Sequence, residues 1–583
     1  MLLTRLTRRR MSALLAVIPA LLARLLRGGE AAAQEATATP GGDDLVPIAG
    51  GATPAAGGTG DLSGNITISV QGNDTQTYQA LADAYVTLHP DVQVKVEIKP
   101  SEGYQEFIRA QFASDTPDVS LVNGNVVADL IQAKRFVDMS AYLDRVSPYT
   151  NKPWRDSMDP AAVANMRDPV SGEMYTLNPE TVQVLWFYNK TAFEKAGILA
   201  EAEQLAQTEK NQPTWDQFMG WCDKLTAAGY IPVAIEGDYR SFWEIRFGWL
   251  ARMYLDQYTR DEAELVRARP GDWNFRDGVD DKWVYDPTDP TNDDATRITF
   301  STQRQMIALR DHQQPVNGAV FQALYTNLKQ FSDRAAPPGW LGTSDAYPLF
   351  LTQEAAIRLD VAALLGNFER DVRNLAEGRY ISDSGAADAN APAATPLPGR
   401  DLDTFEIGSF NNPTMEGPEV DAPARTIEVN IGFYSVPKKD QQQNDLEMDF
   451  LMYMTSPEGF GIYIENRLDP DNAGSGGIVG PPILTDVALP EDLAGKFAQL
   501  KLIGNTEKAT AGTYRARGVA DYQPSVREWV DLTQQFFAGD IDLQKYLDGY
   551  QASIDRLFPE ILTHLQLTPE DLATPEKKPA SQS

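Results

Sequence analysis

Strand patterns and helix patterns follow one another along the first part of the chain. Residues 66–70 alternate as a strand does, and after a polar turn residues 77–88 form a helix. The order repeats with a strand at 92–98, a helix at 104–112 and a buried strand at 117–122. Strands that alternate with helices predict a parallel sheet covered by helices on both faces.

A second apolar run, residues 184–188, is rich in β-branched and aromatic side chains and is continuous rather than alternating. Such a run predicts a strand buried on both faces, as in a helix-covered parallel sheet. It ends at residues 189–190 and turns directly into an amphipathic helix, which makes one βα unit. A helix at 215–228, with Thr214 as its N-cap, and a strand at 231–236 continue the pattern.

Amide and carboxylate side chains stand directly after two of the predicted strands. In open α/β sheets ligands bind beyond the carboxyl ends of the strands, so these turns are candidate ligand contacts. Asn73 and Asp74 follow the first strand, and Asn123 and Asn125 flank Gly124 after the third. Each of them also fits the plainer role of a turn former, with Gly124 in a left-handed conformation.

Length, charge and residue usage limit the classes of function. The 583 residues suffice for two large lobes or three modest domains, and 42% hydrophobic residues provide a sizeable core. A net charge of -31 repels nucleic acid and anionic lipid, so we expect no nucleic-acid partner. Cys222 is the sole cysteine and fits a small buried hydrophobe. With three histidines in the chain, we expect no catalytic triad, no metal site and no cofactor.

Several segments fall outside the predicted core. Residues 1–33, with arginines before an apolar stretch and three alanines at the end, predict a signal peptide, and the Ala, Gly, Thr and Pro of 34–61 predict a flexible linker. An acidic insertion at 256–295 is expected to be a solvated loop, since it lacks the spacing and glycine of a Ca²⁺ loop. We expect a second loop at 382–400 and a disordered tail at 568–583.

Five segments resemble one protein family in their residues and in their order. They are PDVSLVNGNVVADLIQAKRFVDMSAYL at 117–143, QVLWFYNKTAFEKAG at 183–197, TWDQF at 214–218, IEVNIGFYSVP at 427–437 and SPEG at 456–459. The chain resembles the bacterial extracellular solute-binding proteins of family 1, the maltose-binding-protein-like subunits that serve ABC importers.

The resemblance implies a fold and a role. The fold is α/β, periplasmic-binding-protein-like type II, with two lobes joined by a hinge and a ligand cleft between them. The first lobe would comprise 62–180 and 428–486, and the second 186–425 and 490–565. The role is to capture a small polar solute, most often a carbohydrate, and deliver it to the transmembrane permease, without enzymatic chemistry. The protein would be exported, periplasmic or associated with the cell surface, and monomeric.

The resemblance also places candidate ligand contacts. Relatives follow one second-lobe strand with a tryptophan that stacks on sugar, but this chain has Val361, Ala362 and Ala363 there. Aromatic side chains of a nearby loop would supply the missing stacking surface, unless they belong to the packing of the lobe. The candidates implied in this way are Glu180 before the crossing strand, Glu236, Asp238, Tyr239 and Trp243 after a second-lobe strand, and Tyr522 before a late helix.

Two other classes of function fit the composition. A secreted glycoside hydrolase is also long, acidic and aromatic, and the sequence alone does not exclude a pair of catalytic carboxylates among its 82 acidic residues. The chain lacks the eightfold recurrence of a βα barrel, which favours the binding protein. A sensor or adhesin that uses the same two-lobed fold without transport is the other alternative.

Overall fold

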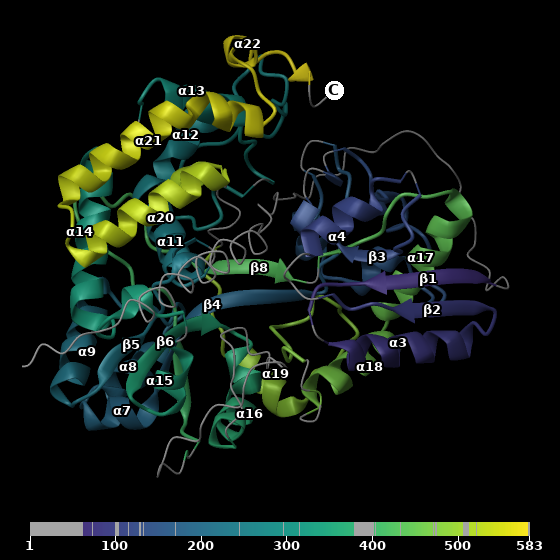
Figure 1. Ribbon diagram of the computed structural model, residues 1–583, viewed down its shortest axis with the longest axis horizontal. Helices are drawn as coiled ribbons and strands as arrows, with labels where there is room; N and C mark the ends of the chain where they lie inside the picture. Colours follow the sequence, from purple (N-terminus) through teal and green to yellow (C-terminus); the bar gives the residue numbers. More distant parts are fainter. Residues whose placement is uncertain are drawn as a thin grey trace, which may run out of the picture.

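The computed structural model describes residues 62–580 except 73, 100–103, 115, 128–129, 132, 169–170, 244, 295, 314, 345, 378–401, 403, 432, 470–471, 473–474, 505–511 and 521. Figure 1 shows two halves of helices and strands, with strands β4 and β8 running side by side between them. The predicted α/β class with two lobes is confirmed. The predicted signal peptide, linker and loop at 382–400 lie outside the described residues.

The first lobe is built on a four-stranded sheet in the order β2-β1-β3-β9. Its first three strands are parallel, as predicted, and β9 is antiparallel to β3. Ile66 and Ile68 of the central strand are almost completely buried, which explains the alternation in the sequence. The elements are β1 (Gly64–Ser69), β2 (Val92–Val96), β3 (Leu121–Asn123), β9 (Tyr434–Ser435), α3 (Thr75–Leu88), α4 (Tyr104–Gln111), α6 (Pro160–Asn165), α17 (Gln441–Met454) and α18 (Pro457–Leu468).

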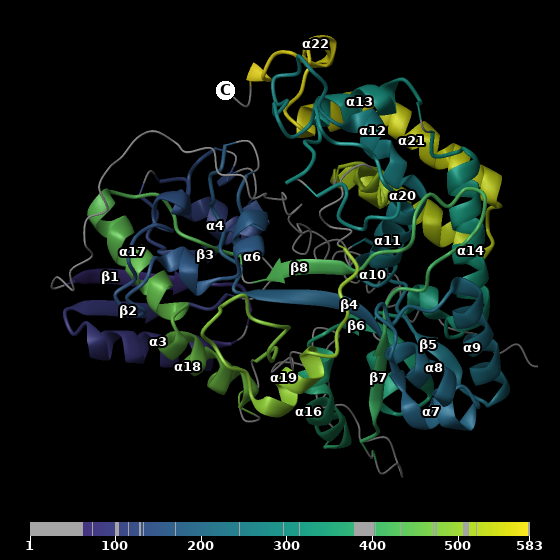
Figure 2. The same cartoon turned by 180° about the vertical axis from the view of Figure 1, so that it is seen from behind.

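The second lobe holds a five-stranded sheet in the order β5-β6-β4-β7, with β8 also paired to β4. Helices surround it in both views (Figures 1 and 2). Its elements are β4 (Glu180–Asn189), β5 (Ile231–Ala234), β6 (Ala355–Val361), β7 (Ile407–Phe410), β8 (Ile427–Ile431), α7 (Lys190–Lys195), α8 (Leu199–Ala206), α9 (Trp215–Ala227), α10 (Tyr239–Trp243), α11 (Phe247–Thr259), α12 (Ala263–Val266), α13 (Thr302–Arg310), α14 (Ala319–Ala335), α15 (Tyr347–Leu351), α16 (Leu364–Ala376), α19 (Glu491–Phe497), α20 (Gln523–Ala538), α21 (Leu543–His564) and α22 (Pro569–Ala573).

Strand β4 is buried on both faces, but its predicted parallel arrangement is wrong. It pairs antiparallel with β6, β7 and β8, and the one parallel pair in this sheet is β5 with β6. The continuous apolar run correctly indicated that the strand is buried on both faces. Helices can cover parallel and antiparallel strands alike, so burial does not reveal the direction of the strand. Trp186 shows how deep the strand lies, because its ring stacks parallel to that of Phe410 and its indole nitrogen donates to Asn412.

Cys222 of α9 is fully buried in the core of the second lobe, as predicted. Burial raises the pKa of its thiol far above the ordinary value, so the thiolate is not populated at neutral pH. The late helical region is two helices, α20 and α21. Gly539 ends the first of them in the left-handed conformation, with φ of 83°. Tyr546 and Tyr550 of α21 are buried.

The acidic insertion is not the solvated loop that its composition predicts. Residues 256–266 are mostly helical, in α11, a 3-10 turn and α12. Asp256 and Asp293 are buried, and both form ion pairs with the buried guanidinium of Arg425. Arg425 lies in a distant segment of the sequence, so the local composition of the insertion could not predict this pairing.

The predicted disorder from residue 568 is wrong for residues 568–580. Helix α22 begins with a capping box in which Thr568 and Asp571 bond each other's backbone. Leu572 is buried, and the Gln303 side chain of α13 donates to the Asp571 carbonyl at 2.7 Å. The tail therefore packs on the second lobe, as Figure 2 also shows.

Three stretches of chain meet where the lobes join. Strand β8 pairs with the first half of β4, from Glu180 opposite Ile431 to Val184 opposite Ile427. On the other side of β4 the Thr181 amide donates to the Pro481 carbonyl at 3.0 Å. The approach is so close that a Cβ atom on Gly480 would lie 1.7 Å from the Thr181 carbonyl oxygen.

We expect Gly480→Ala to lower the free energy of unfolding by about 1–3 kcal/mol, the usual cost of overpacking. Urea unfolding followed by tryptophan fluorescence would measure it. Gly461→Ala is the matched control, since a Cβ at this position in α18 would meet nothing within 4 Å. Equal stability of the two variants would contradict the prediction.

Candidate ligand-binding site

The carboxyl edge of the first sheet carries two half-buried amide side chains. Asn123, at the end of β3, donates from Nδ2 to Oε1 of Gln71, which follows β1, at 3.2 Å. Buried Tyr104 fixes both strand ends, because its hydroxyl donates to the Ser69 carbonyl at 2.5 Å and accepts from the Asn123 amide at 3.0 Å. The predicted contact at Asn123 therefore has a rigid backbone and a partly exposed amide.

The turn that follows β3 is shaped by close packing. Asn125 lies in a short 3-10 helix, Gly124–Val127, directly after the strand. Gly124 has no positive φ, contrary to the left-handed turn expected there. It is needed because a Cβ would lie 2.1 Å from Oγ of Ser435 on β9. Asn73, the candidate of the preceding turn, lies outside the described residues.

Asp74 is engaged inside the first lobe. Its carboxylate caps α3 by accepting from the Thr77 amide at 3.2 Å, which confirms the turn-forming role. It also accepts from Arg467 at 3.0 Å and from Asn472 at 2.8 Å. With 4% of its surface exposed, the side chain has little left to offer a solute.

Glu180, the first residue of β4, is fully buried. Its Oε2 accepts from the Tyr463 hydroxyl at 2.7 Å and its Oε1 from the Val479 amide at 3.2 Å. Burial raises the pKa of this carboxyl, and the nearby positive charge of Arg467 opposes the shift. Glu180 thus holds neighbouring segments together at the point where the chain leaves the first lobe.

Glu236 sits in a closed network of charges beyond β5. Its carboxylate accepts from Arg246 at 3.1 Å, from Arg358 at 2.9 Å and from the Ala346 amide at 2.9 Å. Both guanidinium groups also reach Asp360, at 3.2 and 2.6 Å. Glu236 is completely buried, so this network anchors the chain just before the residues that follow it.

Helix α10 starts three residues after Glu236. Asp238 accepts from the Ser241 amide at 3.0 Å and so stabilises the first turn. Tyr239 is half-buried, and its hydroxyl lies 3.5 Å from Oε1 of Gln523 at the start of α20. Burial raises the pKa of Tyr239, against the effect of nearby Arg527. The aromatic ring of Tyr239 is therefore partly accessible and well supported.

Trp243 and Tyr522 are placed differently. Trp243 is buried, and the guanidinium of Arg517 covers its ring at 5.4 Å while donating to its carbonyl at 2.7 Å. Tyr522 directs its hydroxyl to Glu560 at 2.6 Å, and its ring lies 5.4 Å from that of His564. Tyr522 is therefore attached to the late helix α21.

Phe433 is a residue at this junction that the sequence patterns did not single out. It lies between β8 and β9, is half-buried and has a strained φ of 50°. Its amide donates to Oδ1 of Asn178 at 2.8 Å, and its carbonyl accepts from the Gly124 amide at 3.0 Å. The periodicity of apolar residues does not indicate that an aromatic residue adopts a left-handed conformation. The predicted strand before Phe433 was the one sequence signal that pointed to this position.

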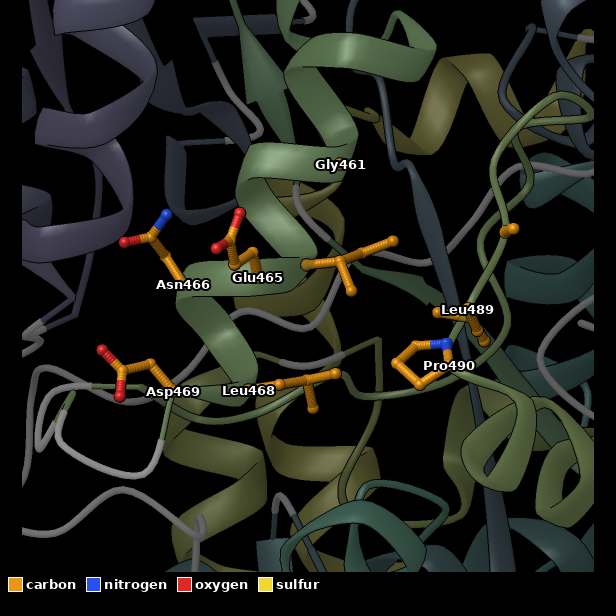
Figure 3. Close-up of a pocket in the computed structure, with 9 residues that line it drawn as sticks. Gly461, Glu465, Asn466, Leu468, Asp469, Leu489 and Pro490 are labelled. Carbon is orange, nitrogen blue, oxygen red and sulfur yellow. The ribbon is translucent and has the colours of Figure 1, made fainter.

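A pocket of about 720 Å³ opens between the C-terminal half of α18 and the segment of Leu489 and Pro490 (Figure 3). None of the candidates among the described residues lines it. Its polar lining is Glu465, Asn466 and Asp469. Within the described part of the chain, no group of three or more His, Cys, Asp or Glu side chains is placed to hold a metal ion. The same residues include no helix with the length and apolarity to cross a bilayer.

Comparisons with known proteins agree with the fold. A family model described as bacterial extracellular solute-binding protein matches residues 71–459. Among solved structures, a chitin oligosaccharide binding protein has a TM-score of 0.50 at 14% identity, covering 86% of this chain and 100% of that one. The GacH receptor of Streptomyces glaucescens GLA.O has a TM-score of 0.49 at 15% identity, with 86% and 99% covered. A family 1 extracellular solute-binding protein from Bifidobacterium longum subsp. infantis has 0.48 at 13%, with 84% and 98% covered. No curated protein sequence matches the chain.

Proposed function

Because this chain belongs to the bacterial extracellular solute-binding proteins, we propose that it captures a carbohydrate between its two lobes and delivers it to the permease of an ABC importer. The protein works outside the cytoplasm, in the periplasm or at the cell surface. It carries out binding and no chemistry. Ligand stabilises the closed arrangement through its higher affinity for that state, and the closed form docks on the transmembrane subunits.

The observation that carries this proposal is the chemistry that follows the strand ends in both lobes. Asn123 and Gln71 supply amide groups on the first lobe, and Tyr239 supplies a half-buried aromatic ring on the second. Sugars need both, because an apolar sugar face packs on an aromatic ring and each hydroxyl left unpaired costs roughly 1–3 kcal/mol. The name of the similar chitin oligosaccharide binding protein supports the same ligand class.

The burial of the candidates divides them into two roles. We assign direct ligand contact to the half-buried Asn123, Asp238 and Tyr239, and to Asn125 from its position directly after β3. Asp74, Glu180, Glu236 and Trp243 are at most 4% exposed, and we assign them to the support of these contacts from behind. Asn73 and Tyr522 complete the candidate set at its margins.

A thermal-shift screen of sugars and polyols, followed by calorimetric titration of the best ligand, tests the proposal. Tyr239→Ala should weaken binding at least tenfold, which corresponds to about 1.4 kcal/mol. Tyr230→Ala is the matched control, since Tyr230 is also half-exposed but precedes β5, at the opposite end of the strand. Equal affinities of the two variants would contradict the assigned site.

Three further outcomes would change the proposal. Binding of no carbohydrate or polyol would overturn the ligand class, while the family would stand. Release of reducing sugar from a glycan would replace the binding role by glycoside hydrolysis. The absence of permease genes beside the gene for this chain would favour a sensor or adhesin.

A further inference from the structure

Phe433 has a strained backbone that the first lobe holds in place. Its φ of 50° lies in the left-handed region, which a bulky side chain adopts only at a cost in free energy. The Phe433 amide donates to Asn178 at 2.8 Å, and its carbonyl accepts from the Gly124 amide at 3.0 Å. The amide and the carbonyl of Tyr434 both bond to Leu177, at 2.9 Å. These four hydrogen bonds all run to first-lobe segments and keep the conformation from relaxing.

The side chain of Phe433 leaves the lobe that holds its backbone. Its ring packs against the hydrophobic cluster of the second lobe, against which Tyr239 also packs, and it stays half-exposed. The backbone dihedral angles set the direction of the Cα–Cβ bond, so the left-handed conformation determines where the ring points. A residue with its backbone in one lobe and its ring on the other lies at the boundary between them.

Phe433 lies next to the amide side chains proposed as ligand contacts. Gly124, which bonds the Phe433 carbonyl, stands between Asn123 and Asn125 in the sequence. Asn123 is also paired with Tyr434 in the ladder of β3 and β9. Phe433 therefore joins a half-exposed aromatic ring to a strand end that carries amide groups. A pyranose sugar presents an apolar face and a rim of hydroxyls, and so requires both kinds of surface together.

The turn itself does not require a phenylalanine. Nine non-glycine residues in the described part of the chain have a positive φ, and Phe433 is the one among them with a large apolar side chain. Glycine and asparagine adopt this conformation at lower cost, so the backbone alone does not account for the ring. Strained positions of this kind cluster at ligand-binding sites, where the strain holds a side chain in a working position. The ring, rather than the turn, therefore indicates what this position does.

We propose that Phe433 is a ligand-contact residue whose ring packs against the apolar face of a pyranose sugar, and that its strained backbone directs the ring into the space between the lobes. The proposal rests on carbohydrate binding between the lobes and adds a second aromatic face to that of Tyr239. Two aromatic faces, one held by each lobe, suit a sugar ring with apolar surfaces. An acyclic polyol has no such extended apolar face, so the ligand class narrows to cyclic sugars.

Calorimetric titration with maltose, raffinose and chitotriose tests the contact. Phe433→Leu keeps an apolar side chain and removes the aromatic face. Its affinity for the sugar that the wild type binds most tightly should fall at least tenfold, whereas Phe433→Tyr should stay within threefold of the wild type. Phe558→Leu is the matched control, because Phe558 of α21 is also half-buried against the second-lobe cluster, and its affinity should not change.

The pattern of losses distinguishes the possible failures. A loss below tenfold in Phe433→Leu, or an equal loss in Phe433→Tyr, would overturn the contact while carbohydrate binding stands. If the wild type binds none of these cyclic sugars, the narrowed ligand class is overturned together with the contact, and the wider screen of sugars and polyols decides the proposed function.

Urea unfolding without ligand tests the strain. Phe433→Ala and Phe433→Gly both remove the ring, but glycine adopts a positive φ at low cost and alanine does not. Phe433→Gly should therefore unfold at a higher urea concentration than Phe433→Ala, although both should bind sugar at least tenfold more weakly than the wild type. Equal urea midpoints would overturn the role of the strain. If Phe433→Leu does not fold, these two variants also decide the contact, which wild-type affinity in Phe433→Gly would overturn.

Discussion

Replacing Arg425 with methionine is expected to lower the free energy of unfolding by about 3–5 kcal/mol. The buried guanidinium bonds the carboxylates of Asp256 and Asp293, and their charges raise its pKa against the effect of burial. Without it, Asp293 is left buried with its charge uncompensated, while Asp256 keeps the bond from Arg260 at 2.8 Å. Urea unfolding at pH 7 measures the loss.

Arg297→Met provides the comparison within the same insertion. Arg297 pairs with Asp289 near the surface, where an ion pair contributes about 0–1 kcal/mol. The double variant Arg425→Met with Asp293→Asn should regain part of the stability, because the unpaired charge is gone. If Arg425→Met is no less stable than Arg297→Met, the insertion is not held by this buried pair.

The second large effect concerns pH. Burial raises the pKa of Asp371 on α16 to about 6, with its neighbour Arg370 opposing the shift. The native state therefore binds this proton more tightly than the unfolded chain, whose carboxyl titrates near 3.8. Lowering the pH from 7 to 4 should add about 2.4 kcal/mol of stability from this one group.

Asp371→Asn isolates that contribution, because the amide does not titrate and still accepts from the Tyr347 hydroxyl, which lies 2.9 Å from the carboxylate. Urea unfolding of both proteins at pH 7, 6, 5 and 4 gives the difference in stability at each pH. Relative to the variant, the wild type should gain stability as the pH falls through 6. A difference that does not vary with pH would show that Asp371 is ionised normally.

Much of the fold was predictable because it follows from the local hydrophobic pattern and from short sequence motifs. The parallel strands of the first lobe, the burial of β4 and the cap at Thr214 were all read correctly. The family resemblance is confirmed over residues 71–459. The direction of β4 was not predictable, since side-chain periodicity is the same for both strand directions.

The candidate site was predictable in outline and less so in detail. The strand-end rule selected Asn123 and the family resemblance selected Tyr239, and both side chains are partly exposed. The resemblance also selected Glu236, whose partner Arg358 lies 122 residues away in sequence. The spacing of residues along the chain does not reveal such a pairing. The sequence therefore cannot distinguish an acidic residue that contacts a solute from one that pairs with a buried guanidinium. The ligand role of each candidate stays a prediction until the titrations are made.

The buried thiol of Cys222 has a practical consequence for biosensor construction. Since this thiol is shielded and protonated, a cysteine introduced at an exposed position would be the preferred target of a maleimide dye. The natural protein needs no cysteine removed first. A dye placed beside Tyr239 would then report the ligand binding that we propose at this residue.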